Sequence, residues 1–153
     1  MSRRVRAESE ELRLARETHL DILIAANRYQ AELEEIVRGL GLTYTQYIAL
    51  WTLTSSDASA TGLPMSALRD RLLTPAADTT RLVARLEREG LAERVGSPDD
   101  GRSILVRVSD KGRRRFEAAR PAVQGYHRGQ FAPLTTDELA LLRSLLRRTL
   151  WGM

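Results

Sequence analysis

Apolar residues recur at helical spacing over the first quarter of the chain. The apolar positions are Leu12, Leu20, Leu23, Ala26, Leu33, Ile36 and Leu40. Glu and Arg residues lie between them, so the pattern predicts one long amphipathic helix over residues 12–40. Gly39 and Gly41 favour the end of this helix, because glycine commonly follows a last helical turn.

A capping signal follows directly. Thr43, with Gln46 three residues later, has the form of a capping box, in which each side chain satisfies a free backbone N–H at a helix start. A second helix is therefore predicted over 44–53. The small polar residues at 55–62 carry almost no periodic apolar signal and predict a loop.

Two further helices are predicted next. Pro64 opens a short helix over 65–72, and Thr74 with Pro75 supplies the N-cap and first residue of another, which Gly90 stops. In the helix that Gly90 stops, one side is predicted to pack, and it carries Thr79, Leu82, Val83 and Leu86. The other side is predicted to be free, and it carries Ala77, Thr80, Arg81 and Ala84.

The hydrophobic pattern then changes to the period of a strand. Short β-rich segments at 91–95 and 102–108 predict two strands, and the Gly, Pro and Asp residues at 96–101 predict a turn between them. We expect a two-stranded hairpin with an exposed tip.

Two helices are predicted to close the chain. Ser109 or Asp110 caps the first, which is expected to reach the region of Gln130 and to bend at Pro121. A second capping box, Thr135 with Glu138, starts the last helix. The apolar positions of this helix are Leu139, Leu142, Leu145, Leu146 and Leu150.

Composition excludes several kinds of chemistry. The chain contains no cysteine among its 153 residues, which excludes disulfides, thiolate metal sites, cysteine nucleophiles and thiol-based redox sensing. With two histidines a conventional zinc site is not expected, and we predict no metal and no cofactor. The sequence has no nucleophile elbow, phosphate-binding glycine loop, His-Glu metal motif or kinase signature, so an enzyme is not expected.

No apolar run approaches the about 18 residues of a membrane span, and the N-terminus lacks the apolar stretch of a signal peptide. We therefore expect a cytoplasmic protein without a membrane partner.

Positive charge is concentrated in the middle of the chain. Residues 5–38 carry five Arg against eight acidic residues, whereas residues 64–115 carry twelve basic against eight acidic residues. Of the 24 basic residues all but Lys111 are Arg, and guanidinium groups suit phosphates and guanine edges. This distribution favours a polyanionic partner, although mildly basic domains without one are common.

The order of the predicted elements is that of a winged helix-turn-helix, so the predicted fold is mainly α with a small β-hairpin wing. In this geometry the second short helix lies in the major groove of double-stranded DNA, with its free face toward the base edges. We expect Arg81 to contact guanine, with Thr80 and Ala77 on the same face. Arg85 is expected to hold a phosphate, and Asp78 a neighbouring basic side chain.

The hairpin tip offers a second contact with DNA. Arg102 is long enough to enter the minor groove, where narrow A·T-rich tracts attract guanidinium. Asp100 is expected to orient an arginine of the same module. The alternative is that Asp99 and Asp100 merely make the turn.

Three segments resemble the MarR (multiple antibiotic resistance regulator) family, and the resemblance covers nearly the whole chain. They are GLTYTQYIAL at 41–50, LVARLEREGLAER at 82–94, and Asp100 and Arg102 followed by VRVSDKG at 106–112. The resemblance implies a homodimer that binds a pseudo-palindromic operator, usually as a repressor, and releases it when a small phenolic or aromatic acid ligand binds. It also implies that Arg102 enters the minor groove. The chain departs from the family at 72–75, which lacks the glycine frequent in that turn, and its lack of cysteine excludes the peroxide-sensing branch.

Apolar surface on the terminal helices also predicts a dimer. Residues 1–40 and 116–153 are expected to form a helical dimerisation region, continuous with a DNA-binding region over 41–115. The leucine-rich stripes of the terminal helices are expected to pack on each other and on a second copy, because the winged module is too small to cover them. A two-fold dimer would set the two recognition helices roughly 34 Å apart, which is one turn of DNA.

Aromatic residues mark a candidate ligand site. Tyr44, Tyr47, Trp51 and His19 lie where the resemblance places the effector pocket. The alternative is that these aromatics belong to the core, which is their more common role at helical spacing. His127 is expected at the surface or an interface rather than in a ligand site. The arginines at 113–115 either follow phosphates or form a solvated helix face.

One other class of function stays open at this point. A winged helix can bind a protein through its wing instead of DNA. Such a module would show no salt-dependent affinity for DNA, and it would tolerate replacement of Arg81 or Arg102 by Ala.

Overall fold

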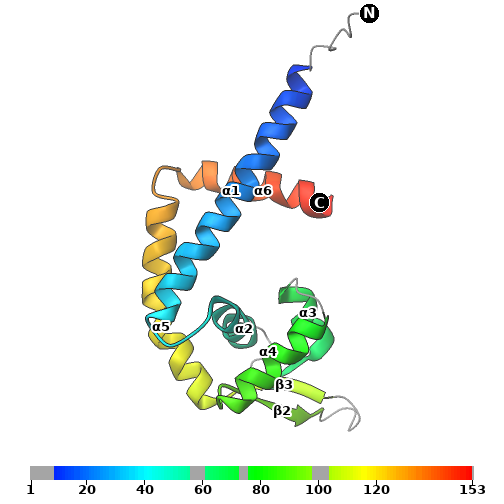
Figure 1. Cartoon of the computed structure of the whole chain (residues 1–153), viewed down its shortest axis with the longest axis vertical. Helices are drawn as coiled ribbons and strands as arrows, with labels where there is room; N and C mark the ends of the chain where they lie inside the picture. Colours follow the sequence, from blue (N-terminus) through cyan, green and yellow to red (C-terminus); the bar gives the residue numbers. More distant parts are fainter. Residues whose placement is uncertain (1–8, 56–60, 73–75, 98–103, 153) are drawn as a thin grey trace, which may run out of the picture.

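A computed structural model describes residues 9–55, 61–72, 76–97 and 104–152. The described part is mainly helical, with one small antiparallel sheet (Figure 1). In chain order the elements are α1 (Glu10–Arg38), α2 (Tyr44–Thr54), β1 (Leu63–Pro64), α3 (Met65–Leu72), α4 (Ala76–Arg88), β2 (Ala92–Gly96), β3 (Ile104–Val108), α5 (Asp110–Gln130) and α6 (Thr136–Trp151). This architecture confirms the predicted fold class.

The long helix α1 is held to the rest of the chain near its C-terminal end. Only Leu33 and Val37 are buried in it, while its N-terminal half is exposed. Tyr126 of α5 donates a 2.7 Å hydrogen bond to Glu32, which also accepts one from Arg28. Burial and the hydrogen bond to Glu32 raise the pKa of Tyr126 to about 12. These contacts fix α1 against α5.

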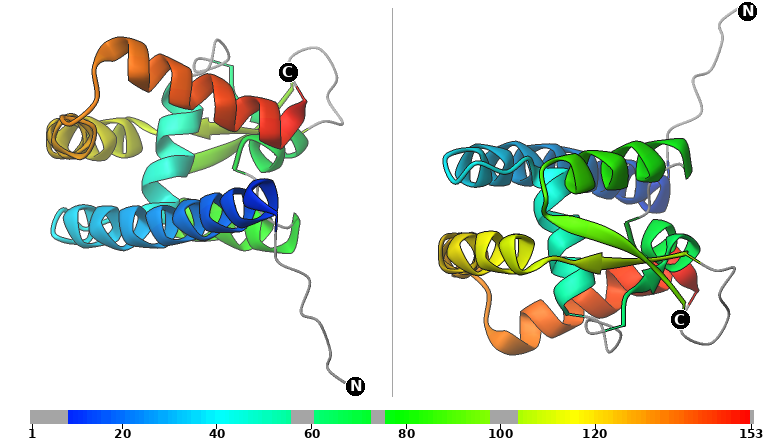
Figure 2. Two further views of the ribbon diagram at one scale, coloured as in Figure 1. Left: turned by 90° about the horizontal axis from the view of Figure 1, so that it is seen from above. Right: turned by 90° about the horizontal axis from the view of Figure 1, so that it is seen from below.

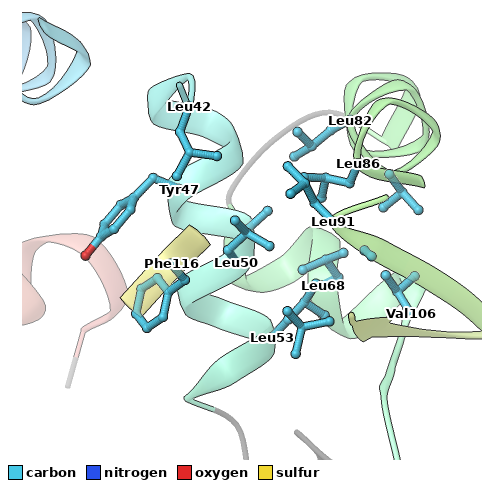
Figure 3. Close-up of a cluster of buried hydrophobic side chains, with 14 of the residues drawn as sticks. Leu42, Tyr47, Leu50, Leu53, Leu68, Leu82, Leu86, Leu91, Val106 and Phe116 are labelled. Atoms are coloured by element: carbon cyan, nitrogen blue, oxygen red, sulfur yellow. The ribbon is translucent and has the colours of Figure 1, made fainter. Parts of the chain in front are cut away.

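The helix α2 forms the centre of the molecule. The predicted capping box is confirmed, since Thr43 accepts from Gln46 N and Gln46 accepts from Thr43 N. Six of the eleven residues of α2 are buried, so it is covered on several sides. Figure 3 shows side chains from α2, α3, α4, β3 and α5 meeting around it, in one cluster that includes Leu50, Leu53, Leu68, Leu86, Val106 and Phe116.

The sheet has three strands instead of the predicted two. Their order is β1-β3-β2, with Leu63 opposite Val106 and Ala92 opposite Val108. Pro64 belongs to β1, and α3 begins one residue later at Met65. A two-residue strand has no alternating pattern to detect, and a proline, which cannot donate a hydrogen bond, is tolerated at the edge of a sheet. The prediction missed β1 for these reasons.

The helix α4, whose open face is the predicted recognition surface, ends where the sequence indicated. Gly90 has a φ of +71°, which a residue with a side chain rarely adopts, and Leu91 N donates to Leu86 O across this turn. The helix begins at Ala76. The predicted cap at Thr74 and Pro75 lies outside the described residues, as does the turn at 98–101.

Ser109 caps α5, which runs through Pro121, and the α5 ribbon changes direction midway in Figure 1.

The last helix, α6, lies apart from α1. The capping box at Thr135 and Glu138 starts α6 as predicted. Both views of Figure 2 show α6 separated from α1, and none of its residues is buried. Within the single chain α1 packs on α5 as expected, whereas α6 has no buried residue, because the turn after Phe131 directs it away. The expected packing of these helices on a second copy stays a prediction.

Candidate nucleic-acid interface

One face of α4 is buried and the opposite face is open to solvent. Thr79, Val83 and Leu86 are buried, and Figure 3 shows Leu86 in the central cluster. Thr80 and Arg81 are exposed, and the Arg81 side chain keeps 79% of its surface accessible. The predicted division of the helix into a packed and a free face is confirmed for these residues. Ala77 falls in the first turn of the same helix.

The charged groups on the open face of α4 contact each other weakly. Arg81 Nη2 lies 3.6 Å from Asp78 Oδ1, and both side chains are exposed. An exposed ion pair of this kind contributes about 0–1 kcal/mol. Arg81 can therefore leave Asp78 for a guanine edge at little cost.

Arg85 lies one turn further along α4 in a more connected position. Its Nε donates a 2.9 Å hydrogen bond to Glu89 Oε1. Glu89 also accepts from the buried amide of Gln46. The hydrogen bonds from Arg85 and Gln46 lower the pKa of Glu89, so its carboxylate stays ionised.

The wing is braced by ion pairs at its base. Arg107 of β3 contacts Glu93 of β2 at 2.7 Å, and Arg94 contacts Glu87 of α4 at 3.0 Å. The strands are thereby tied to each other and to α4. The candidate tip residues Asp100 and Arg102, with Asp99, lie outside the described residues.

Two basic residues of α3 escaped the sequence analysis. Arg69 and Arg71 are exposed in the last turn of this helix. The first helix of a helix-turn-helix crosses the DNA backbone, so both are candidates for phosphate contacts. The distance of Arg69 and Arg71 from the free face of α4 depends on the angle between α3 and α4, which the sequence does not display. The basic charge of this segment was the only sequence signal that pointed to these two residues.

A pocket of about 820 Å³ lies beside the winged module, between α2 and α5. Tyr44, Tyr47 and Trp51 line it from α2, as predicted from the sequence. From α5 it is lined by Arg113, Phe116, Glu117, Arg120, Val123, Gln124 and His127. His19 is exposed on α1 and does not line the pocket. His127 is exposed at the surface, as expected, and it also lines the open side of the pocket.

The aromatic residues of this pocket serve the core as well. Tyr47 is buried with its ring 5.4 Å from that of Phe116, and Figure 3 shows its hydroxyl pointing away from the leucine cluster. Burial raises the pKa of Tyr44 and of Tyr47, so both phenols are neutral hydrogen-bonding groups at neutral pH. The two interpretations of these aromatics are thus compatible for Tyr47.

The described residues, which leave out 1–8, 56–60, 73–75, 98–103 and 153, contain no group of three or more His, Asp or Glu side chains that could hold a metal ion. None of their helices has the length and apolar character needed to cross a membrane.

Known proteins similar to this chain are regulators of transcription. Residues 40–103 match the MarR family. The uncharacterized HTH-type transcriptional regulator Mb0904 of Mycobacterium bovis is 33% identical over 124 residues, which are 81% of this chain and 84% of that protein.

Two solved structures add complexes to this comparison. A mutant MarR from E. coli, crystallised with operator DNA, has 27% identity and a TM-score of 0.75 over 92% of this chain and 96% of that chain. The PcaV transcriptional regulator from Streptomyces coelicolor, crystallised with its natural ligand, has 28% identity and a TM-score of 0.66 over 82% of this chain and 88% of that chain.

Proposed function

Because the chain belongs to the MarR family of winged helix-turn-helix, DNA-binding transcriptional regulators, we propose that it is a homodimeric repressor of a pseudo-palindromic operator. We further propose that a small aromatic acid releases it from that operator. The observation that carries the proposal is the open face of α4, where Thr80 and Arg81 are exposed while the opposite face is anchored in the core.

The open face of α4 suits direct contact with bases. A helix fits the major groove, and an arginine can bind guanine O6 and N7 through two hydrogen bonds. Arg81 is the most exposed candidate for that contact, and Arg85 lies one turn away, where a phosphate contact is expected. Arg102 of the wing is proposed to enter the minor groove, and Asp100 to orient an arginine.

The homodimer is supported by uncovered apolar surface at both ends of the chain. In the N-terminal half of α1 the exposed apolar residues are Leu12, Leu14, Leu20, Ile22, Leu23 and Ile24. In α6 they are Leu139, Leu141, Leu142, Leu145, Leu150 and Trp151. Most of the stability of a helix in a protein comes from packing of its apolar face, and none of the 16 residues of α6 is buried in the single chain, so α6 needs a partner. A second copy related by a two-fold axis offers the same apolar surfaces in return.

The pocket between α2 and α5 supports release by a ligand. Its wall combines the rings of Tyr47 and Phe116 with the cationic groups of Arg113 and Arg120. This combination suits a flat molecule with one negative charge, because the rings pack on its apolar part and a guanidinium binds a carboxylate. A ligand that favours a dimer geometry with misplaced recognition helices would weaken operator binding.

The test is a titration of the protein with DNA from around its own gene, followed by fluorescence anisotropy at several salt concentrations. We expect affinity to fall steeply with salt, because binding releases counterions from the phosphates. Arg81→Ala should lose roughly 1–3 kcal/mol per half-site and relax the preference at one base position. Arg85→Ala should weaken binding to all sequences alike.

The same titration separates DNA binding from the protein-interaction alternative. Flat salt dependence would contradict DNA binding and favour the protein-interaction alternative. Equal losses for the two variants on operator and random DNA would contradict base contact by Arg81. Repeating the titration with benzoate and hydroxybenzoate as probes tests release. Binding of such a probe without a change in operator affinity would contradict the proposed release.

A further inference from the structure

A buried glutamine joins the second helix to the recognition helix. Gln46 is only 1% exposed, although its side chain is polar. Its Oε1 accepts a 2.9 Å hydrogen bond from Thr43 N, and its Nε2 donates a 2.7 Å hydrogen bond to Glu89 Oε2. The second contact links residues 43 positions apart in the sequence.

Glu89 receives donors from three helices. Its carboxylate accepts from Gln46 of α2 and from Arg85 Nε of α4, and Lys111 Nζ of α5 donates a 2.7 Å hydrogen bond to its backbone oxygen. This residue directly follows the last residue of α4. The end of α4 is therefore connected to α2 and α5, which contribute most of the residues that line the pocket.

The amide of Gln46 does more than the capping box requires. The residue at this position of a capping box needs an acceptor for one backbone N–H, and glutamate supplies that as well as glutamine does. Only glutamine also offers a donor for the Glu89 carboxylate. An exposed ion pair between residues four apart on a helix is weak and poorly ordered by itself. Here the buried amide of Gln46 holds the Glu89 carboxylate of the Arg85–Glu89 pair in place.

We propose that Gln46 and Glu89 are positioning residues for DNA binding, which hold the Arg85 guanidinium in place for a phosphate. The contact with Glu89 uses Nε of Arg85, so the two terminal amino groups of the guanidinium remain for the phosphate. This inference rests on the proposed function, because it assumes that α4 binds DNA.

The variant that tests it is Gln46→Glu, which keeps the acceptor for Thr43 N but faces Glu89 with a second carboxylate. At about pH 8 both carboxylates are ionised and repel each other, and Arg85 loses its fixed partner. Operator affinity should then fall about three- to tenfold, and the slope of log affinity against log salt should decrease by up to about 1 per Arg85 contact. At about pH 5 the two carboxylates share a proton, which restores a hydrogen bond between them, so the ratio of variant to wild-type affinity should recover.

The other charged groups near the Gln46–Glu89 contact act equally in both proteins. They are Arg88 on α4, Lys111 on α5 and Glu34 of α1, which accepts from Tyr44 N at the start of α2. Expressing each result as the ratio to wild type at the same pH removes their contribution, together with that of the two histidines.

A second set of variants distinguishes positioning from general damage to the fold. In an Arg85→Ala background, Gln46→Glu should cause no further loss of affinity, because the residue it positions is gone. Glu89→Ala should weaken binding as Gln46→Glu does at about pH 8, but without recovery at about pH 5. Equal losses from Gln46→Glu in both backgrounds, or wild-type affinity at the higher pH, would overturn the proposal while leaving DNA binding intact. Absence of salt-dependent binding by the wild type would overturn the proposed function and this inference together.

Discussion

Truncation of one leucine on α6 tests the dimer most directly. Leu145 lies in the apolar stripe of α6 and is 45% exposed in the single chain. Full burial of a leucine side chain contributes about 1.5–3 kcal/mol. Burial of the exposed part by a partner therefore contributes roughly half of that, and a two-fold interface contains the residue twice. Leu145→Ala should weaken the dimer by about 1–3 kcal/mol, which raises its Kd by about 5- to 150-fold.

Sedimentation equilibrium over a dilution series measures this Kd. Ser144→Ala is the matched control, because Ser144 is exposed on the opposite side of α6 from the leucine stripe. It should leave the dimer unchanged. A wild-type protein that remains a monomer at every concentration would refute the dimer, and equal effects of the two variants would refute the role of the leucine stripe.

Two further predictions concern the stability of the fold. Gly112→Ala should destabilise the protein by about 3 kcal/mol, since a Cβ there would overlap the Leu91 carbonyl oxygen. Gly125→Ala in the same helix places its Cβ in open space and should stabilise the protein by about 0.5–1 kcal/mol. Chemical denaturation measures the free energy of unfolding of both variants, and a similar loss for both would contradict the packing argument. Tyr126→Phe should cost about 1 kcal/mol at neutral pH, because it removes the hydrogen bond to Glu32. The folded pKa of about 12 for Tyr126 lies above the unfolded value of about 10, so its contribution is present below about pH 10 and is lost as pH rises toward 12. The difference in unfolding free energy between wild type and variant should shrink over that range, and a constant difference would argue against this assignment.

Most helix boundaries could be predicted because their signals are local. The capping boxes at Thr43 and Thr135 involve residues three positions apart, so the sequence displays both partners together. The packed face of α4 was visible for the same reason, since apolar side chains at helical spacing share one side. The short strand β1 was not visible, because Leu63 and Pro64 become a strand only through their pairing with Val106 and Leu105.

The composition of the candidate site was predicted only in part. Tyr44, Tyr47 and Trp51 share a face of α2, and the resemblance placed them together. The opposite wall comes from α5, which lies about 70 residues further along the sequence. No local pattern indicated that Arg113, Arg120 and His127 would face the aromatic residues of α2. His19 was grouped with the aromatics, yet the direction of α1 carries it away from the pocket.

The amino-acid sequence by itself determined which segments form helices, which face of the recognition helix packs, and the excess of arginine in the segment that carries that helix. The helices and the packed face depend on hydrogen bonds and side-chain spacing within a few residues, and the arginine excess is a matter of composition alone. The tertiary structure decided which residues lie opposite α2 in the pocket and which carboxylate accepts the hydrogen bond from the buried amide of Gln46. It also decided that no residue of α6 is buried within its own chain. These contacts join distant segments, and they depend on the angles at which packed helices cross, which no local pattern of residues specifies.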